Sequence, residues 1–71
     1  MKIEWEGRHG ATPSGWGVLL VVGGWGEPVY RINFYQPGSK SHIPDRAFDV
    51  EVGDIEALQA DAETLAEGMG I

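Results

Sequence analysis

Residues 16–35 read WGVLLVVGGWGEPVYRINFY, two apolar runs on either side of a turn rich in glycine. The first run, Trp16–Val22, is apolar at both odd and even positions, which is typical of a central strand covered on two sides. Segment 23–28 contains three glycines and a proline and predicts a hairpin loop, after which Val29–Tyr35 returns as a strand. This stretch therefore predicts the centre of an antiparallel sheet.

Two further strands are expected outside this pair. Residues 2–6 and 46–52 both alternate polar and apolar side chains, as a strand with one face in water should. In the second of these, the alternation predicts three inward side chains, Phe48, Val50 and Val52. Segment 7–15 is rich in turn residues and predicts a connection, and segment 36–45 predicts the longest loop.

The last part of the chain, residues 54–67, predicts an amphipathic helix. Its apolar residues recur at helical spacing, at Ile55, Leu58, Ala62 and Leu65. Asp54 is expected to cap the start of this helix, and Gly68 is expected to end it in a left-handed conformation. The sequence thus predicts a single α+β domain over residues 1–71, in which a four-stranded antiparallel sheet (ββββα) carries the helix on one face.

Composition indicates a small soluble protein. The chain has 71 residues and no cysteine, which excludes disulfides and thiolate metal sites and favours an intracellular location. The first residues lack an apolar signal core, and the longest apolar run, Val18–Val22, is too short to cross a bilayer. We therefore expect a protein of the cytoplasm, in whichever cell produces it or is infected.

The negative charge is concentrated at one end of the chain. Residues 45–67 hold eight carboxylates against one arginine, a net charge of −7, whereas residues 1–44 hold three carboxylates against four bases, a net charge of +1. Such a field attracts basic partners and repels nucleic acid and anionic membranes. The sequence therefore predicts a basic-surfaced protein partner and no direct binding of nucleic acid or membrane.

The predicted helix and the strand before it supply the candidate binding residues. On the helix, Glu56, Glu63 and Glu67 fall within an arc of about 40°, and Asp61 lies on the opposite flank of the apolar stripe. Asp49 and Glu51 are expected to extend the same surface from the strand. Carboxylates about 6 Å apart along a ridge resemble the spacing of phosphates on a nucleic-acid strand. The hypothesis is that this surface occupies a basic groove; the alternative is that the charge serves only solubility.

Two apolar features offer further contacts. Trp25 lies between Gly24 and Gly26 in the predicted hairpin loop, where it could anchor in a partner's pocket or fold over the end of the sheet. Because one helix covers only one sheet face, one of two sets in the strand 16–22 must face outward, either Leu19 and Val21 or Trp16, Val18, Leu20 and Val22. Dimerisation, docking of a partner or coverage by segment 7–15 would each bury that face.

No motif predicts catalysis, a cofactor or a metal site. The glycine-rich segment 23–26 is followed by another strand, whereas a phosphate cradle leads into a helix N-terminus. The two histidines, His9 and His42, have neither chelating spacing nor a recognisable nucleophile nearby.

In its size, its acidity and its lack of a recognisable active site, the chain resembles small inhibitors encoded by viruses and mobile elements, among them DNA mimics and anti-CRISPR proteins. The resemblance implies a non-enzymatic protein that blocks a basic nucleic-acid-binding surface on a partner, such as a nucleic-acid-binding complex. The residues that would bind the partner are Asp49, Glu51, Glu56, Asp61, Glu63, Glu67 and Trp25. The alternative is a homodimeric structural or accessory module that uses the outward sheet face.

Overall fold

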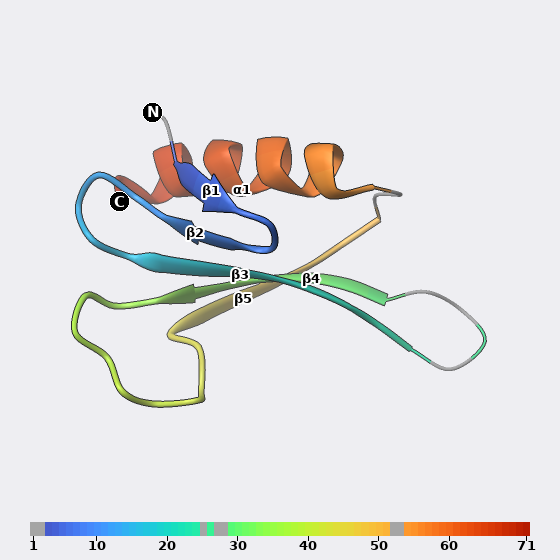
Figure 1. Cartoon of the computed structure of the whole chain (residues 1–71), viewed down its shortest axis with the longest axis horizontal. Helices are drawn as coiled ribbons and strands as arrows, with labels where there is room; N and C mark the ends of the chain where they lie inside the picture. The colour runs from blue at the N-terminus through green and yellow to red at the C-terminus, as the bar shows by residue number, and fades with distance from the viewer. Residues whose placement is uncertain (1–2, 25, 27–28, 52–53) are drawn as a thin grey trace.

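The chain forms an antiparallel sheet followed by one C-terminal helix (Figure 1), which confirms the predicted α+β fold class. The computed structural model describes residues 3–24, 26, 29–51 and 54–71. The elements in chain order are β1 Glu4–Glu6, β2 His9–Ala11, β3 Gly17–Gly23, β4 Val29–Tyr35, β5 Arg46–Val50 and α1 Ile55–Met69. The strands pair in the order β1-β2-β3-β4-β5, so each strand is bonded to its neighbours in the chain.

The sheet has five strands, so the prediction of four was wrong. The additional strand, β2, lies in segment 7–15, which we had interpreted as a connection. Glu6 pairs with His9 across a two-residue turn, and Gly7 at the first central position of that turn has a φ of 61°. Glycine at this position is typical of the turns that close antiparallel hairpins. The strand was missed because three residues with Gly10 at their centre show no apolar alternation.

The core lies between the two central strands and the helix. Register pairs Val18 with Phe34 and Leu20 with Ile32, which places all four side chains on the face toward α1. They are buried against three helix residues, Leu58, Ala62 and Ala66. From the edge strand β5, the Phe48 ring meets the Phe34 ring edge-on at 6.0 Å between centroids.

The hairpin of β1 and β2 closes over Gly10. A Cβ atom at this position would lie 2.7 Å from the Ile3 side chain and 2.7 Å from the Trp5 ring. Real Cβ atoms do not approach other heavy atoms so closely, so the apolar side chains of this hairpin occupy the space that any other residue at position 10 would need.

The ends of α1 have specific caps. The Asp54 carboxylate accepts a hydrogen bond from the Ala57 amide at 2.7 Å, as predicted for the N-cap. At the other end the helix passes through Gly68 and ends at Gly70, whose φ is 72°, so the expectation for Gly68 was wrong. The Gly70 and Ile71 amides donate to the carbonyls of Glu67 and Ala66. Met69 and Ile71 pack against the core beside this end of the helix.

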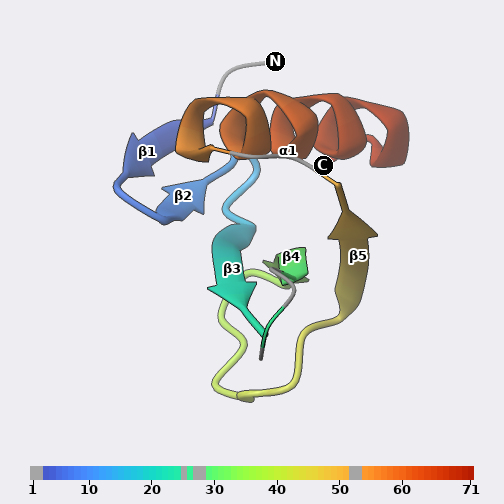
Figure 2. The ribbon, with the colours of Figure 1, turned by 90° about the vertical axis from the view of Figure 1, so that its right-hand side faces the viewer.

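The sheet has one face toward α1 and one face away from it, which we call the outer face. Strand alternation places twelve residues of β2 to β5 on the outer face: His9, Ala11, Gly17, Leu19, Val21, Gly23, Val29, Arg31, Asn33, Tyr35, Ala47 and Asp49. The loop 36–45 lies on this side of the sheet, opposite the helix (Figure 2). Its ends are joined, because the Gln36 amide donates to the Asp45 carboxylate at 2.9 Å and the Asp45 amide to the Phe34 carbonyl at 2.9 Å.

Candidate functional site

The carboxylates of the helix form two rows with an uncharged strip between them. At 100° per residue, Glu56, Glu63 and Glu67 lie on one flank, and Asp54 and Asp61 lie on the other. Between the rows, on the side away from the buried Leu58, Ala62 and Ala66, are the small residues Ala57, Ala60 and Thr64. We call these five carboxylates the acidic helix surface. The uncharged strip was missed in the sequence, although the helical positions of these small residues could have revealed it.

The two rows have the same repeat. Asp54 and Asp61 are seven residues apart, and so are Glu56 and Glu63. Seven residues make almost two helical turns and a rise of about 10.5 Å, so each residue lies nearly above its equivalent. No Lys or Arg occurs from residue 47 to the end of the sequence, so α1 offers no basic residue to neutralise the rows.

Members of the surface differ in exposure. Asp54, Glu56 and Glu67 are exposed, whereas Asp61 and Glu63 are half-buried. Glu63 is half-buried because one carboxylate oxygen accepts a hydrogen bond from the Ile3 amide at 3.2 Å. This bond and a second one, from the Gln59 side chain to the Gly7 carbonyl, join the helix to the N-terminal hairpin. Glu63 is therefore partly a structural residue.

We expect Glu63→Ala to lower the free energy of unfolding by about 1–2 kcal/mol, because the Ile3 amide loses a charged acceptor. Glu63→Gln keeps an acceptor at the same position and should lose clearly less, although alanine is the better helix former. Urea denaturation of the two variants measures the difference. Equal stability of the two variants would show that the hydrogen bond to Ile3 contributes nothing.

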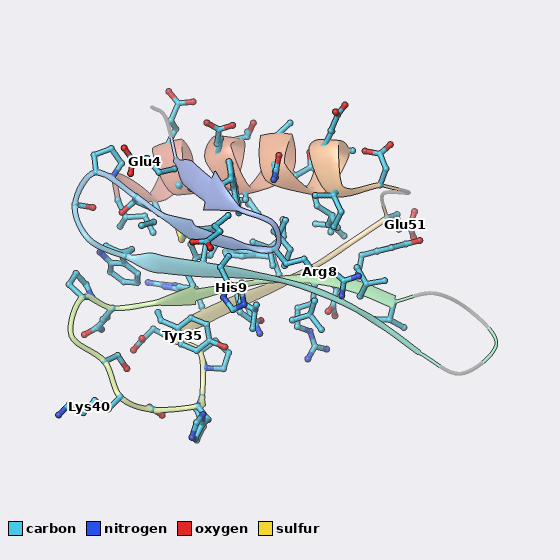
Figure 3. All side chains as sticks on the ribbon, in the orientation of Figure 1. Glu4, Arg8, His9, Tyr35, Lys40 and Glu51 are labelled. Atoms are coloured by element: carbon cyan, nitrogen blue, oxygen red, sulfur yellow. The ribbon has the colours of Figure 1, made fainter. Side chains whose placement is uncertain are left out.

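Asp49 does not join the acidic helix surface. It lies on the outer face, opposite Arg31 in the register, and its carboxylate accepts from the Arg31 Nε at 2.8 Å. Alternation along β5 sends Phe48 and Val50 toward the core and Asp49 to the other side. Glu51 is exposed and follows β5 at the approach to α1 (Figure 3). Trp25 and Val52 lie outside the described residues.

A second surface feature is a groove on the outer face with a volume of about 430 Å³. We call it the outer groove; its lining includes His9, Gly17, Leu19, Tyr35, Ser41 and His42. His9 and Tyr35 lie on the side of β3 away from α1 (Figure 3), and the loop 36–45 supplies Ser41 and His42. Both histidines of the chain thus line one groove, which their positions in the sequence did not predict.

Asn33 is the buried polar residue of the outer face, with 9% of its surface exposed. Its Nδ2 lies 3.5 Å from the Tyr35 hydroxyl, at the limit of a hydrogen bond. Its Oδ1 is buried and has no hydrogen-bond partner among the residues that the structure describes. A buried acceptor left in this state destabilises a fold by about 1–3 kcal/mol.

We expect Asn33→Val to raise the free energy of unfolding by about 1–2 kcal/mol, because it removes the unsatisfied acceptor and places a β-branched residue in a central strand. The midpoint of urea denaturation should rise at unchanged slope. A lower midpoint would show that the Asn33 amide stabilises the protein through contacts of its own.

The described part of the chain contains no group of three or more His, Asp or Glu residues arranged to hold a metal ion. Among the same residues, no helix has the length and apolar character needed to cross a membrane.

Comparisons of this chain with protein-family models, with curated proteins and with solved structures gave no match.

Proposed function

We propose that this chain is a non-enzymatic inhibitor or regulator that binds a basic protein surface through the acidic helix surface. The single observation that carries the proposal is the pair of carboxylate rows on a helix that contains no basic residue. A partner whose groove normally holds a nucleic-acid backbone presents lysines and arginines of the complementary sign. In this proposal the protein acts as a DNA mimic and excludes nucleic acid from that groove.

The shape of the surface supports this mode of binding. The small residues Ala60 and Thr64 project outward between the rows, and the Thr64 hydroxyl already donates to the Ala60 carbonyl at 3.1 Å. A partner's backbone could therefore approach the helix closely without displacing a long side chain. Its basic residues would then reach Glu56 and Glu67 on one flank and Asp61 on the other.

The remaining candidate residues have different places in the proposal. Glu51 is exposed just before α1, so it would extend the negative surface beyond the helix N-terminus. Asp49, which is paired with Arg31 on the outer face, would contribute only if the partner also reached that side. Trp25 remains a proposed anchor for a pocket of the partner, and this proposal rests on the sequence alone.

Competition with DNA tests the proposal. The immobilised protein is used to capture a partner from lysate, the partner is purified, and its complex is challenged with duplex DNA. We expect DNA to release the partner at a concentration that rises in proportion to the amount of immobilised protein, because both ligands would need the same groove. A stable ternary complex of protein, partner and DNA would contradict the mimic mechanism.

The outer face favours one alternative, a homodimeric structural or accessory module. Leu19 and Val21 are half-buried there, and Val29 has 47% of its surface exposed. Packing of two outer faces would remove this apolar surface from water. Sedimentation equilibrium tests the alternative, since a monomer mass that does not change with concentration would contradict it.

A further inference from the structure

The outer groove lies over a position of the sheet that has no side chain, Gly17. In the register, Ala11, Gly17 and Tyr35 form one row across the outer face, and His9, Leu19 and Asn33 form the next. Gly17 leaves a hollow between its larger neighbours, which becomes a groove where the loop 36–45 brings Ser41 and His42 to its edge. Its volume of about 430 Å³ falls in the range of small-molecule sites.

Packing does not require glycine at position 17. A Cβ atom there would lie 3.8 Å from the Tyr35 Cβ, which is an ordinary van der Waals contact. The backbone of Gly17 is also not in the left-handed region that favours glycine. This differs from Gly10, where neighbouring side chains fill the space. The hollow is therefore a feature that the fold tolerates and does not need.

Asn33 indicates which chemical group a ligand of the groove should carry. It faces Leu19 across the strand pair and stands two residues before Tyr35 on the same strand, so it lies beside two of the groove's walls. Its buried Oδ1 accepts no hydrogen bond from the described residues. A ligand that donates an N–H between Leu19 and Tyr35 would satisfy it after a small movement of either side chain.

We propose that the outer groove binds a planar cation rich in N–H donors, namely a guanidinium group. The Tyr35 ring lines the groove and would stack on a guanidinium, and the Ser41 hydroxyl, which accepts the Ile43 amide at 3.0 Å, has a second lone pair for one of its N–H groups. The buried Asn33 Oδ1 lies beside the groove lining and would accept another N–H once Leu19 or Tyr35 moves. The formal net charge of −6 attracts a cation to the molecule. No Lys or Arg is among the residues that line the groove, so it holds no permanently charged base that would repel a cation.

The same observations argue against other small ligands. Among the described residues, no Lys or Arg side chain lines the groove to bind a phosphate or a carboxylate. The net charge of −6 on the protein also repels such anions. An ammonium has the favoured charge but lacks the planar shape that matches the Tyr35 ring. Guanidinium chemistry has two sources, a free metabolite or an arginine side chain of another protein, and the probes below distinguish them.

The experiment is a ¹⁵N–¹H NMR titration of the intact protein. Three probes are compared: N-acetyl-L-arginine methylamide, which represents a protein side chain, agmatine, which represents a free guanidine, and N-acetyl-L-lysine methylamide. We expect saturable shifts at the amides of His9, Leu19 and Tyr35 with the two guanidines and at least about tenfold weaker binding of the lysine probe. Tighter binding of the arginine methylamide would assign the groove to a protein side chain, and tighter binding of agmatine would assign it to a metabolite.

Three variants locate the site. Gly17→Val should weaken binding at least about tenfold, because its side chain fills the hollow. Gly23→Val is the matched control in the same strand, since its Cβ would meet nothing within 4 Å, and binding should stay within about twofold of the parent. Asn33→Val should weaken guanidinium binding and at the same time raise the melting temperature. If Asn33 had only a structural role, the substitution would not weaken binding in a more stable protein.

Several results would overturn the proposal. These are no saturable shift, equal binding of the lysine probe, or undiminished binding by Gly17→Val. If Gly17→Val does not fold, as its spectrum would show, undiminished binding by Asn33→Val overturns the proposal instead. The site is independent of the acidic helix surface, so Glu56→Gln should leave the guanidinium Kd within about twofold.

Discussion

Replacement of Gly10 by valine is expected to lower the free energy of unfolding by about 3 kcal/mol, a large part of the stability of a domain of this size. Even the first atom of a side chain at this position would lie 2.7 Å from both Ile3 and the Trp5 ring. The larger valine must displace the ring or separate β1 from β2. Because Ile3 is a core residue and its amide donates to Glu63, the damage would extend to the packing of the helix.

Urea denaturation followed by tryptophan fluorescence measures this loss. Gly23→Val is the control, because it introduces the same side chain into β3 where nothing lies within 4 Å of its Cβ. We expect the control to change stability by no more than about 0.5 kcal/mol. If Gly10→Val were as stable as the control, Trp5 would not pack closely against Gly10 in the hairpin.

Conversion of Glu56 and Glu67 together to glutamine is expected to weaken binding of the basic partner at least about tenfold. Each lost ion pair at a partly exposed interface contributes about 0.7 kcal/mol, and two such pairs correspond to a tenfold change in Kd. These two positions are exposed and lie at opposite ends of one row, so the change removes charge along the length of the helix. Glu63 is left intact because it supports the fold.

A matched pair separates local charge from total charge. Glu4→Gln with Glu6→Gln removes two exposed carboxylates from β1, so both double variants have a formal net charge of −4 in place of −6. We expect the β1 pair to bind the partner within about threefold of the parent. Equal weakening by both pairs would show that the partner responds to net charge and that the helix has no special role.

Patterns of apolar residues were sufficient to predict most of the fold. The helical spacing of Leu58 and Ala62 correctly predicted a buried face. In segment 16–22, Val18 and Leu20 are buried, whereas Leu19 and Val21 are only half-buried on the outer face, so the prediction of a strand covered on two sides holds for one side. The short strand β2 could not be predicted in this way, since its pairing depends on the turn at Gly7 and on the packing of Trp5 over Gly10. The helix end at Gly70 likewise depends on burial of Ile71, which is a tertiary contact.

The candidate surface was predicted only in part. The carboxylates of α1 follow from helical periodicity, so Glu56, Asp61 and Glu67 are where the sequence placed them relative to the apolar stripe. Asp49 was grouped with them because it is near in sequence, yet strand alternation places it on the opposite side of the sheet, beside Arg31. The outer groove could not be foreseen, because its lining residues come together only in the folded sheet.

The salt dependence of partner binding shows whether the carboxylates of α1 contact a basic groove. The purified partner is titrated with the parent protein, the Glu56 and Glu67 double variant and the Glu4 and Glu6 double variant, each at several salt concentrations between about 50 and 500 mM. If carboxylates of α1 contact the basic groove, the Kd of the parent rises steeply with salt, and the slope of log Kd against log salt falls in the helix variant alone. A Kd that is independent of salt, or the same slope for all three proteins, would contradict the account.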